Sequence, residues 1–320
     1  MLRSFLIYLS KAPWAQNLIM SWPFAWKVAS RFVAGQNLTQ AIAVVNDLNK
    51  TGINATLDHL GEHTSTAEEA SQATADIIAT LDEIQRSGVR ANISIKLTQI
   101  GVGLDEALCR DNLLRILQRG REHRIFVRID MEDTPYTDVT LALYSAMLER
   151  GFTPEHFGLV TQAYLLRSEA DLKRLLEMRT RVRIVKGAYN EPPEKAFPKK
   201  ADTDANYDLL VKLVLDQAGT IDYHLSADGR TPALLAVATH DDKRIQFATS
   251  YAAKLDLPKD MFEFQMLYGI RRDAQTKLVK DGYSVRVYVP FGTRWYPYFM
   301  RRLAERPANI WFFVSNFLRG

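Results

Sequence analysis

Short β-prone apolar segments alternate with amphipathic segments from residue 53 onward in this 320-residue chain. The predicted strands number eight and cover residues 53–57, 93–97, 125–129, 157–162, 182–185, 234–238, 262–267 and 285–289. The predicted helices between them repeat apolar residues at helical spacing and include 67–86, 104–122, 139–149, 168–178 and 206–218. Such alternation is typical of a parallel sheet whose strands are connected by helices.

Eight strand–helix repeats within about 270 residues fit the dimensions of a (β/α)8 barrel, for which about 250 residues is typical. A doubly wound parallel sheet is the alternative. It is less favoured because no predicted strand leads into a G-x-G-x-x-G turn or a P-loop. The sequence therefore predicts an α/β protein with a barrel domain over residues 46–320 and an N-terminal helical arm over residues 1–45.

The composition narrows the class of protein and its compartment. The chain is 47% hydrophobic and 24% charged, which is an ordinary balance for a soluble globular protein. A single cysteine, Cys109, excludes an intramolecular disulfide and fits a reducing, cytoplasmic setting. The net charge is only +4, and basic residues nowhere alternate densely with aromatic ones, so we expect no nucleic-acid partner.

Residues 1–46 contain basic and large apolar side chains but no acidic one, since the first is Asp47. No segment reaches the roughly 18–20 apolar residues that span a bilayer, and Pro13 and Pro23 interrupt the apolar runs. The remaining interpretations, in order of preference, are an arm packed on the core or on a partner, a membrane-surface helix, and an organelle transit peptide. We predict that residues 1–35 contact a membrane or a partner; on a membrane they would attach peripherally to the inner face.

Polar side chains end nearly every predicted strand, and in a barrel these ends form the active site. They include Asp58, Glu62, Lys96, Asp130, Glu132, Gln162, Tyr164, Arg183, Lys186, Tyr189, His240, Gln265, Arg286 and Tyr288. An isolated pair such as Lys96 and Asp130 also fits a buried structural ion pair. The set lacks a nucleophile–base pair, and His59 with His63 lacks a third metal ligand, so we expect an organic cofactor and no metal.

Arg301 and Arg302 follow the aromatic segment 295–299 and Met300, and they precede Glu305. On a helix, Glu305 lies one turn beyond both arginines and can hold one guanidinium. The other guanidinium can then bind a carboxylate through two parallel hydrogen bonds. An exposed helix face with local ion pairs is the alternative. The neighbouring aromatic side chains favour an anion-binding site.

Eight short motifs, in order along the chain, resemble those of the proline dehydrogenase family. They lie at residues 57–62, 94–97, 128–132, 162–164, 183–189, 238–240, 264–269 and 301–309. The chain is similar to the stand-alone bacterial type and to the corresponding domain of the bifunctional proline utilisation A proteins. This resemblance implies a distorted (β/α)8 TIM barrel that binds FAD, with its last helix over the mouth.

The resemblance also implies a substrate site on that last helix. Arg301 and Arg302 would bind the carboxylate of L-proline, and Glu305 would orient the two arginines. Glu62 would close the site through an ion pair with Arg301.

Three further residues complete the implied substrate site from within the barrel. Lys96 would add positive charge, and Asp130 would orient Lys96. Tyr288 would lie against the proline ring and exclude larger or hydroxylated substrates.

The implied cofactor site lies on the neighbouring strands. Arg183 would approach flavin N5 and, with Gln162, tune the isoalloxazine. The other implied FAD contacts are Asp130, Val185, Lys186, Gly187, Ala188, Tyr189, Thr239 and His240. The family pattern is broken at Asp241, where asparagine is common, and at His59, where an apolar residue is common.

The chemistry implied by the family is hydride transfer from the ring carbon beside nitrogen to flavin N5. The product would be Δ1-pyrroline-5-carboxylate, and a membrane quinone would take the electrons. The proline amine must be neutral when the hydride leaves, so the rate should rise with pH. One rival hypothesis is a Schiff-base aldolase or phosphate-binding barrel that uses Lys96 or Lys186 as its amine. The other is a membrane-associated amino-acid-binding protein without a cofactor.

Overall fold

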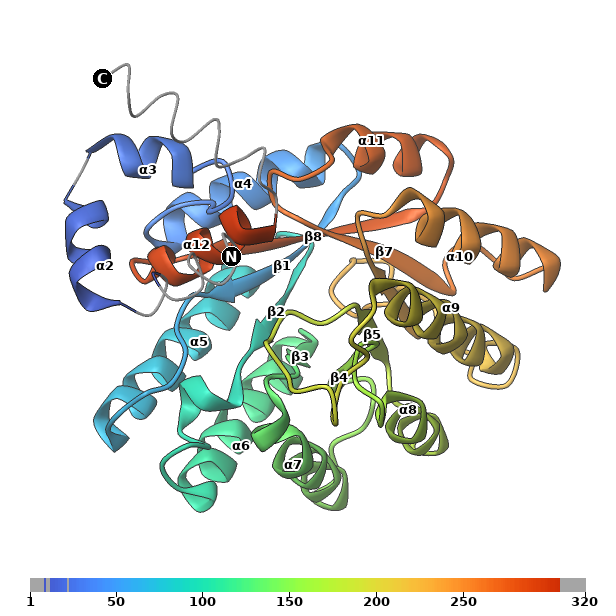
Figure 1. The fold of residues 1–320 in the computed structure, drawn as a ribbon, viewed down its shortest axis with the longest axis horizontal. Coiled ribbons are helices and arrows are strands. Elements are labelled where there is room, and N and C mark those ends of the chain that lie inside the picture. Colours follow the sequence, from blue (N-terminus) through green and yellow to red (C-terminus); the bar gives the residue numbers. More distant parts are fainter. Residues whose placement is uncertain (1–8, 10–11, 22, 306–320) are drawn as a thin grey trace.

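The protein is a closed barrel of eight parallel strands surrounded by helices (Figure 1). The computed structural model describes residue 9 and residues 12–21 and 23–305. The strands lie side by side in chain order from β1 to β8, and β8 pairs with β1 to close the sheet. This topology confirms the predicted barrel with its N-terminal helical arm and excludes the doubly wound alternative.

The elements within the described residues follow the predicted alternation. The strands are β1 (Asn54–His59), β2 (Ala91–Ile95), β3 (Val127–Ile129), β4 (Phe157–Gln162), β5 (Val182–Val185), β6 (Leu235–Ala238), β7 (Phe262–Leu267) and β8 (Ser284–Phe291). The helices are α2 (Pro13–Met20), α3 (Pro23–Ala29), α4 (Leu38–Lys50), α5 (Ala67–Ser87), α6 (Glu106–His123), α7 (Thr137–Glu149), α8 (Ser168–Glu177), α9 (Lys200–Gln217), α10 (Asp242–Lys254), α11 (Arg272–Lys280) and α12 (Trp295–Glu305). Short 3₁₀ helices, η1 (Leu97–Ile100) and η2 (Thr134–Tyr136), follow β2 and β3.

Three predicted strands coincide with β4, β5 and β7, and the other five differ at one or both ends. The predicted strand 125–129 begins too early, because Arg124 adopts a left-handed conformation at the end of α6 (φ 55°). Ile125 then donates its backbone N–H to Gly120 and still belongs to the helix end. The predicted strand 93–97 ends too late, because η1 begins at Leu97 and leaves Lys96 just beyond β2.

The floor of the barrel carries a buried ion pair between Arg286 and Glu263. Both side chains are fully buried, and the Arg286 Nε and Nη2 atoms lie 2.8 and 3.0 Å from the two carboxylate oxygens of Glu263. The Arg286 guanidinium also donates to the carbonyls of Ala55 and Gly229. Arg286 pairs in register with Asn54, the first residue of β1, so it lies at the end of the barrel opposite the strand C-termini. We therefore assign Arg286 to the stability of the barrel.

The N-terminal arm packs against α12 beside the barrel mouth. Phe32, Val33 and the small residues of α2 and α3 form one apolar cluster with Trp295, Phe299 and other residues of α12. Figure 1 shows α2, α3 and α12 lying together at one side of the barrel. No helix of the described residues is long and apolar enough to cross a membrane.

Helix α4 joins the arm to the barrel and crosses position 45, where the sequence placed the boundary. Its buried residues Ala41, Ile42 and Val45 belong to the main core. The segment before α4 also pairs with the end of β8, because Ala34 donates to the Pro290 carbonyl and Gly292 donates to the Gly35 carbonyl. The arm is therefore anchored on the barrel by backbone hydrogen bonds as well as by apolar contacts.

The N-terminal arm approaches the barrel closely at Gly269, just after β7, and a substitution there tests this contact. Its φ is +76°, and a Cβ atom there would lie 1.8 Å from the Arg31 carbonyl oxygen. We expect Gly269→Ala to lower the free energy of unfolding by about 2–5 kcal/mol, from left-handed backbone strain and overpacking. Gly151→Ala is the matched control, because Gly151 also has a positive φ (+85°) but no atom lies within 4 Å of an added Cβ. It should cost only about 1–2 kcal/mol. Equal losses in urea denaturation would contradict the close contact.

Candidate active site

Lys96 lies at the centre of a charged network inside the C-terminal end of the barrel. Its Nζ atom is 3.2 Å from Asp58 Oδ1, 3.3 Å from the Tyr288 hydroxyl and 3.5 Å from Asp130 Oδ2. Asp58 is the penultimate residue of β1, Lys96 follows β2, Asp130 follows β3 and Tyr288 lies in β8. Parallel strands of a closed barrel bring these four positions together, although 230 residues separate Asp58 from Tyr288.

Asp130 connects this network to Arg183 on β5. Its Oδ1 atom accepts a hydrogen bond from Arg183 Nη1 at 2.7 Å, and its Oδ2 atom accepts one from the Tyr288 hydroxyl at 2.8 Å. The remaining Arg183 nitrogens donate to Gln265 Oε1 at 2.5 Å and to Ser94 Oγ at 3.0 Å. The guanidinium therefore has three hydrogen-bond partners and is held in one orientation.

Mutual attraction keeps the network charged despite its burial. Burial acts to lower the pKa of the Lys96 ammonium, but the negative charges of Asp58 and Asp130, with the Tyr288 hydroxyl, raise this pKa well above its usual range. Burial acts to raise the pKa of Asp130, but Lys96 and Arg183 outweigh it and the pKa is lowered. For Asp58 the effect of burial is larger than that of Lys96, so its pKa is raised.

Arg301 on α12 forms the expected ion pair with Glu62 in the loop after β1. The pairing is bidentate, with Nη1 at 2.9 Å and Nη2 at 2.7 Å from the two Glu62 oxygens. Burial acts to raise the pKa of Glu62, but Arg301 and Lys96 lower it, so the carboxylate stays charged. The Arg302 guanidinium lies over the Tyr298 ring at 5.2 Å. The Glu305 side chain lies outside the described part of the structure, so its predicted role is not tested.

Apart from Asp130, which follows β3, the residues expected to contact FAD lie at or just beyond the ends of β4, β5 and β6. Gln162 donates to the Glu132 carbonyl at 2.8 Å. Lys186 is paired with Asp204 at 2.5 Å and with Asp241 at 2.8 Å. Asp241, the departure from the family pattern, thus has two local roles, because its side chain also accepts from the Lys243 N–H at the start of α10. Asparagine could supply the cap but not the ion pair.

The residues around Gly187, just beyond β5, are compatible with the organic cofactor that the sequence predicts, FAD. Gly187 has φ +115°, and a Cβ atom there would lie 2.1 Å from the Tyr164 ring, so only glycine fits. Val185 and Tyr189 are half-buried, and Ala188 is exposed. Cationic and amide donors next to accessible backbone suit an anionic, planar cofactor such as FAD.

Thr239 and His240, the other expected FAD contacts, are engaged within the protein. The Thr239 hydroxyl accepts from the Asp241 N–H at 3.1 Å, and His240 Nε2 accepts from the Leu267 N–H at 2.9 Å. These bonds fix the loop after β6 and the tautomer of His240, whose proton is then on Nδ1.

Tyr189 connects the expected cofactor residues to the expected substrate residues. Burial raises the pKa of its hydroxyl, and the carboxylates of Glu62 and Glu132 add to this effect. The charges of Lys96 and Arg301 act in the opposite direction. The charges of both the Lys96 network and the Glu62–Arg301 pair therefore act on the Tyr189 hydroxyl.

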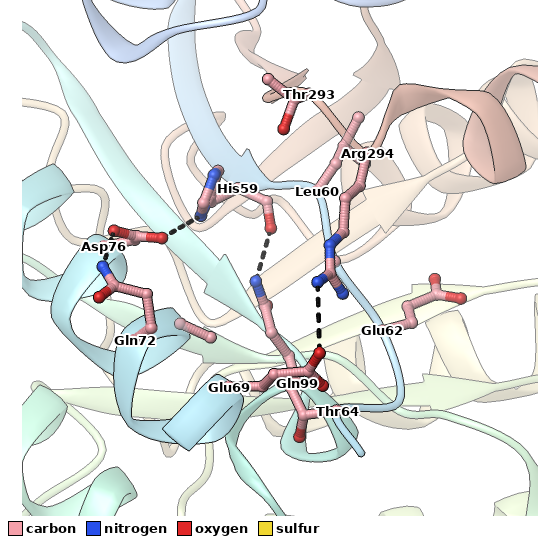
Figure 2. A pocket seen from close by; sticks show the side chains of 12 residues that line it. His59, Leu60, Glu62, Thr64, Glu69, Gln72, Asp76, Gln99, Thr293 and Arg294 are labelled. Carbon is pink, nitrogen blue, oxygen red and sulfur yellow. Dashed lines mark hydrogen bonds and ion pairs between the residues drawn. The ribbon is translucent and has the colours of Figure 1, made fainter. Parts of the chain in front are cut away.

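A separate pocket of about 230 Å³ lies between α5, the loop after β1 and the loop before α12 (Figure 2). Of the sequence-predicted site residues, only Glu62 lines it, and Figure 2 shows the Glu62 side chain directed away from the other labelled side chains. His59, the second departure from the family pattern, lines this pocket. Its ring stacks on Phe291 with centroids 5.1 Å apart, and its Nδ1 atom is 3.9 Å from Asp76.

Sequence reasoning gave no role to several residues that the structure brings into the site. Asp58, Glu132 and Gln265 were recognised only as polar strand ends. Ser94 precedes Lys96 by two positions on an inward-facing strand, and this period-two spacing could have identified it. Asp204 lies on α9, far along the chain from Lys186, and no local pattern identifies it.

Comparison with known proteins gives the same assignment over most of the chain. The family profile described as "Proline dehydrogenase" matches residues 41–314. The chain belongs to the proline dehydrogenase family. It is 38% identical over 310 residues to "Proline dehydrogenase 2" of Bacillus subtilis (strain 168), covering 97% of this chain and 96% of that protein. It is 41% identical over 298 residues to "Proline dehydrogenase" of Deinococcus radiodurans, covering 92% and 91%.

A solved structure of this family has the same fold. Proline utilization A (PutA) from Bdellovibrio bacteriovorus, inactivated by N-propargylglycine, superposes with a TM-score of 0.79 at 27% identity. The likeness covers 88% of this chain and 33% of that one, so the shared part is one region of a longer protein. Membership in the proline dehydrogenase family makes this chain an oxidoreductase.

Glu132 is buried beside the site, and the effect of its burial on its pKa can be tested through the pH dependence of stability. It accepts from the Thr98 N–H at 3.0 Å and from the Thr98 hydroxyl. Burial raises its pKa to about 7, so its contribution to stability is present below its usual pKa and is lost as pH rises through 7. Glu132→Gln imitates the protonated carboxyl. We expect it to match the wild type near pH 4 and to be more stable by about 3 kcal/mol at pH 8.

Urea denaturation at the two pH values measures this difference. Glu122→Gln, at an exposed position on α6, is the control and should show the same difference from the wild type at both pH values. A pH-independent effect of Glu132→Gln would contradict the proposed protonation of Glu132.

Proposed function

We propose that this chain oxidises L-proline to Δ1-pyrroline-5-carboxylate with bound FAD and passes the electrons to a membrane quinone. The supporting observation is the convergence of Lys96, Tyr288 and the Glu62-bound Arg301 at the C-terminal end of the barrel. A carboxylate ligand of small size needs cationic donors at one end and a flat wall beside its ring. The site offers both.

In this proposal, Arg301, Arg302 and Lys96 bind the proline carboxylate, and Tyr288 lies against the ring. Arg301 already holds a carboxylate in bidentate geometry, that of Glu62, so it is oriented for this type of contact before substrate arrives. The Glu62–Arg301 pair joins the loop after β1 to α12 and would exclude water from the closed site. The amine of proline loses its proton to solvent before oxidation.

FAD would be held by Gln162, Arg183 and Lys186 with the backbone at 185–189, Thr239 and His240. When bound, it supplies the hydride acceptor for the carbon beside the proline nitrogen. Arg183 is fixed by Asp130, Gln265 and Ser94, so its positive charge is held beside the reacting region without reorganisation.

The aldolase alternative is disfavoured by the state of the two candidate lysines. A Schiff-base lysine needs a lowered pKa to be neutral and nucleophilic. The pKa of Lys96 is instead raised by Asp58 and Asp130, and Lys186 is paired with two carboxylates. Neither amine is arranged to attack a carbonyl.

For the membrane part of the proposal, α2 supplies the surface. Trp14 and Leu18 are 60% and 51% exposed and one helical turn apart, and no acidic residue precedes Asp47. Exposed Lys27 on α3 adds attraction to anionic lipid. The rest of the arm covers α12, so its deletion would uncover the helix that carries Arg301.

The central test is proline-dependent reduction of the FAD-loaded protein. We expect a yellow protein whose flavin is bleached by L-proline. Arg301→Met and Arg302→Met should each weaken proline binding by tenfold or more, about 1.5–3 kcal/mol, while FAD stays bound. Arg294→Met, an exposed arginine in the loop before α12, is the control and should change affinity less than about twofold. A folded protein that takes up no FAD, or full affinity in both variants, would refute the proposal.

The membrane contact is tested by Trp14→Ser combined with Leu18→Ser, which leaves the buried side of α2 intact. We expect binding to phosphatidylglycerol vesicles, measured by sedimentation, to fall at least about fivefold because two apolar contacts are lost. Proline oxidation with a soluble dye should be unchanged. Gln16→Ser on the same helix is the control. Unaltered vesicle binding in the double variant would rule out this face.

A further inference from the structure

We propose that Asp58 is a positioning residue that holds Lys96 in place for the substrate carboxylate. Family resemblance gives this task to Asp130, whereas the geometry points to Asp58 as the principal counterion of Lys96. The inference rests on the proposed function, because it takes Lys96 to be a ligand of the proline carboxylate.

The hydrogen bonds of Lys96 are the first argument. An ammonium group has three N–H donors, and Lys96 has three acceptors within reach. The shortest contact, 3.2 Å, is to Asp58 Oδ1, and the longest, 3.5 Å, is to Asp130 Oδ2. The third acceptor is the neutral hydroxyl of Tyr288 at 3.3 Å.

The occupancy of Asp130 is the second argument. Its two oxygens already accept shorter hydrogen bonds, from Arg183 at 2.7 Å and from Tyr288 at 2.8 Å. Lys96 shares the oxygen that Tyr288 uses. For Asp58, by contrast, the charge of Lys96 is the strongest of the interactions that lower its pKa, ahead of a hydrogen bond from the Tyr288 hydroxyl. The Asp58 side chain is also 1% exposed, so its charge depends on Lys96 for compensation.

Comparison with the Arg286–Glu263 pair separates a positioning role from a purely structural one. That pair is fully buried at the opposite end of the barrel, and backbone carbonyls accept the other guanidinium hydrogen bonds. Lys96 lies at the active end and keeps 11% of its side chain exposed. Its contact with the Tyr288 hydroxyl is the only one of the three that involves no opposite charge. A substrate carboxylate can take the place of that contact while Asp58 keeps Lys96 fixed.

A double-mutant cycle tests whether Asp58 acts through Lys96. The ligand is tetrahydrofuran-2-carboxylate, a proline isostere in which oxygen replaces the ring nitrogen, so no oxidation of an amine follows. Its Kd is measured by titration calorimetry with the FAD-loaded wild type, Asp58→Asn, Lys96→Met and the double variant. We expect Asp58→Asn to raise Kd about tenfold when Lys96 is present and less than about twofold in the Lys96→Met background.

The direction of the change is itself informative. Removal of the Asp58 charge makes the site more positive, which by simple attraction would tighten binding of an anion. Weaker binding therefore reports the loss of Lys96 positioning. Unchanged or tighter binding in Asp58→Asn, or an equal loss in both backgrounds, would overturn the inference.

Two controls keep the test decisive. Asp82→Asn, which removes a carboxylate paired with His123 in the outer helical layer, should leave Kd unchanged. If Asp58→Asn does not fold with FAD, Asp58→Ser removes the same charge with less bulk and replaces it in the cycle. A wild-type protein that neither binds the isostere nor oxidises proline would refute the proposed function itself. A functional wild type with an additive cycle would refute only the role of Asp58.

Discussion

The arrangement of the site depends on the interactions of the Asp130 carboxylate. It accepts hydrogen bonds from Arg183 on β5 and Tyr288 on β8, and it faces Lys96 beyond β2. Each charged group would be costly to bury alone, but the two cations, Lys96 and Arg183, and the two carboxylates, Asp58 and Asp130, together give no net charge. The same interactions that make the network tolerable inside the barrel therefore hold its side chains in place before any ligand binds.

The mouth of the barrel is organised around α12. One face of this helix packs with the N-terminal arm in an apolar cluster, and Arg301 near its C-terminal end pairs with Glu62 from the loop after β1. Because α12 is held from both sides, the position of its arginines depends on residues almost 300 positions earlier in the chain. Part of the arm is buried against α12, whereas Trp14 and Leu18 of α2 are exposed.

The charged groups at the two ends of the barrel differ in how fully they are paired and buried. At one end, Arg286 and Glu263 satisfy each other and the surrounding carbonyls, which leaves no donor for a ligand. At the other end, Lys96 and Lys186 are each paired with two carboxylates but keep part of their side chains exposed. Asp241 shows how a departure from a family pattern can be accommodated locally, because it neutralises Lys186 while still capping α10.

The sequence by itself determined the fold class and most of the polar groups of the site. Period-two and helical apolar patterns predicted every strand, and strand-end positions predicted Lys96, Asp130, Arg183 and Tyr288, since parallel strands must present their C-terminal ends together. The tertiary structure decided which groups meet. Asp58 as the partner of Lys96, Asp204 as a partner of Lys186, and the arm on α12 all depend on contacts between distant segments. Local sequence patterns do not predict such contacts, because the register of the closed barrel and the packing of its outer helices determine which distant residues meet.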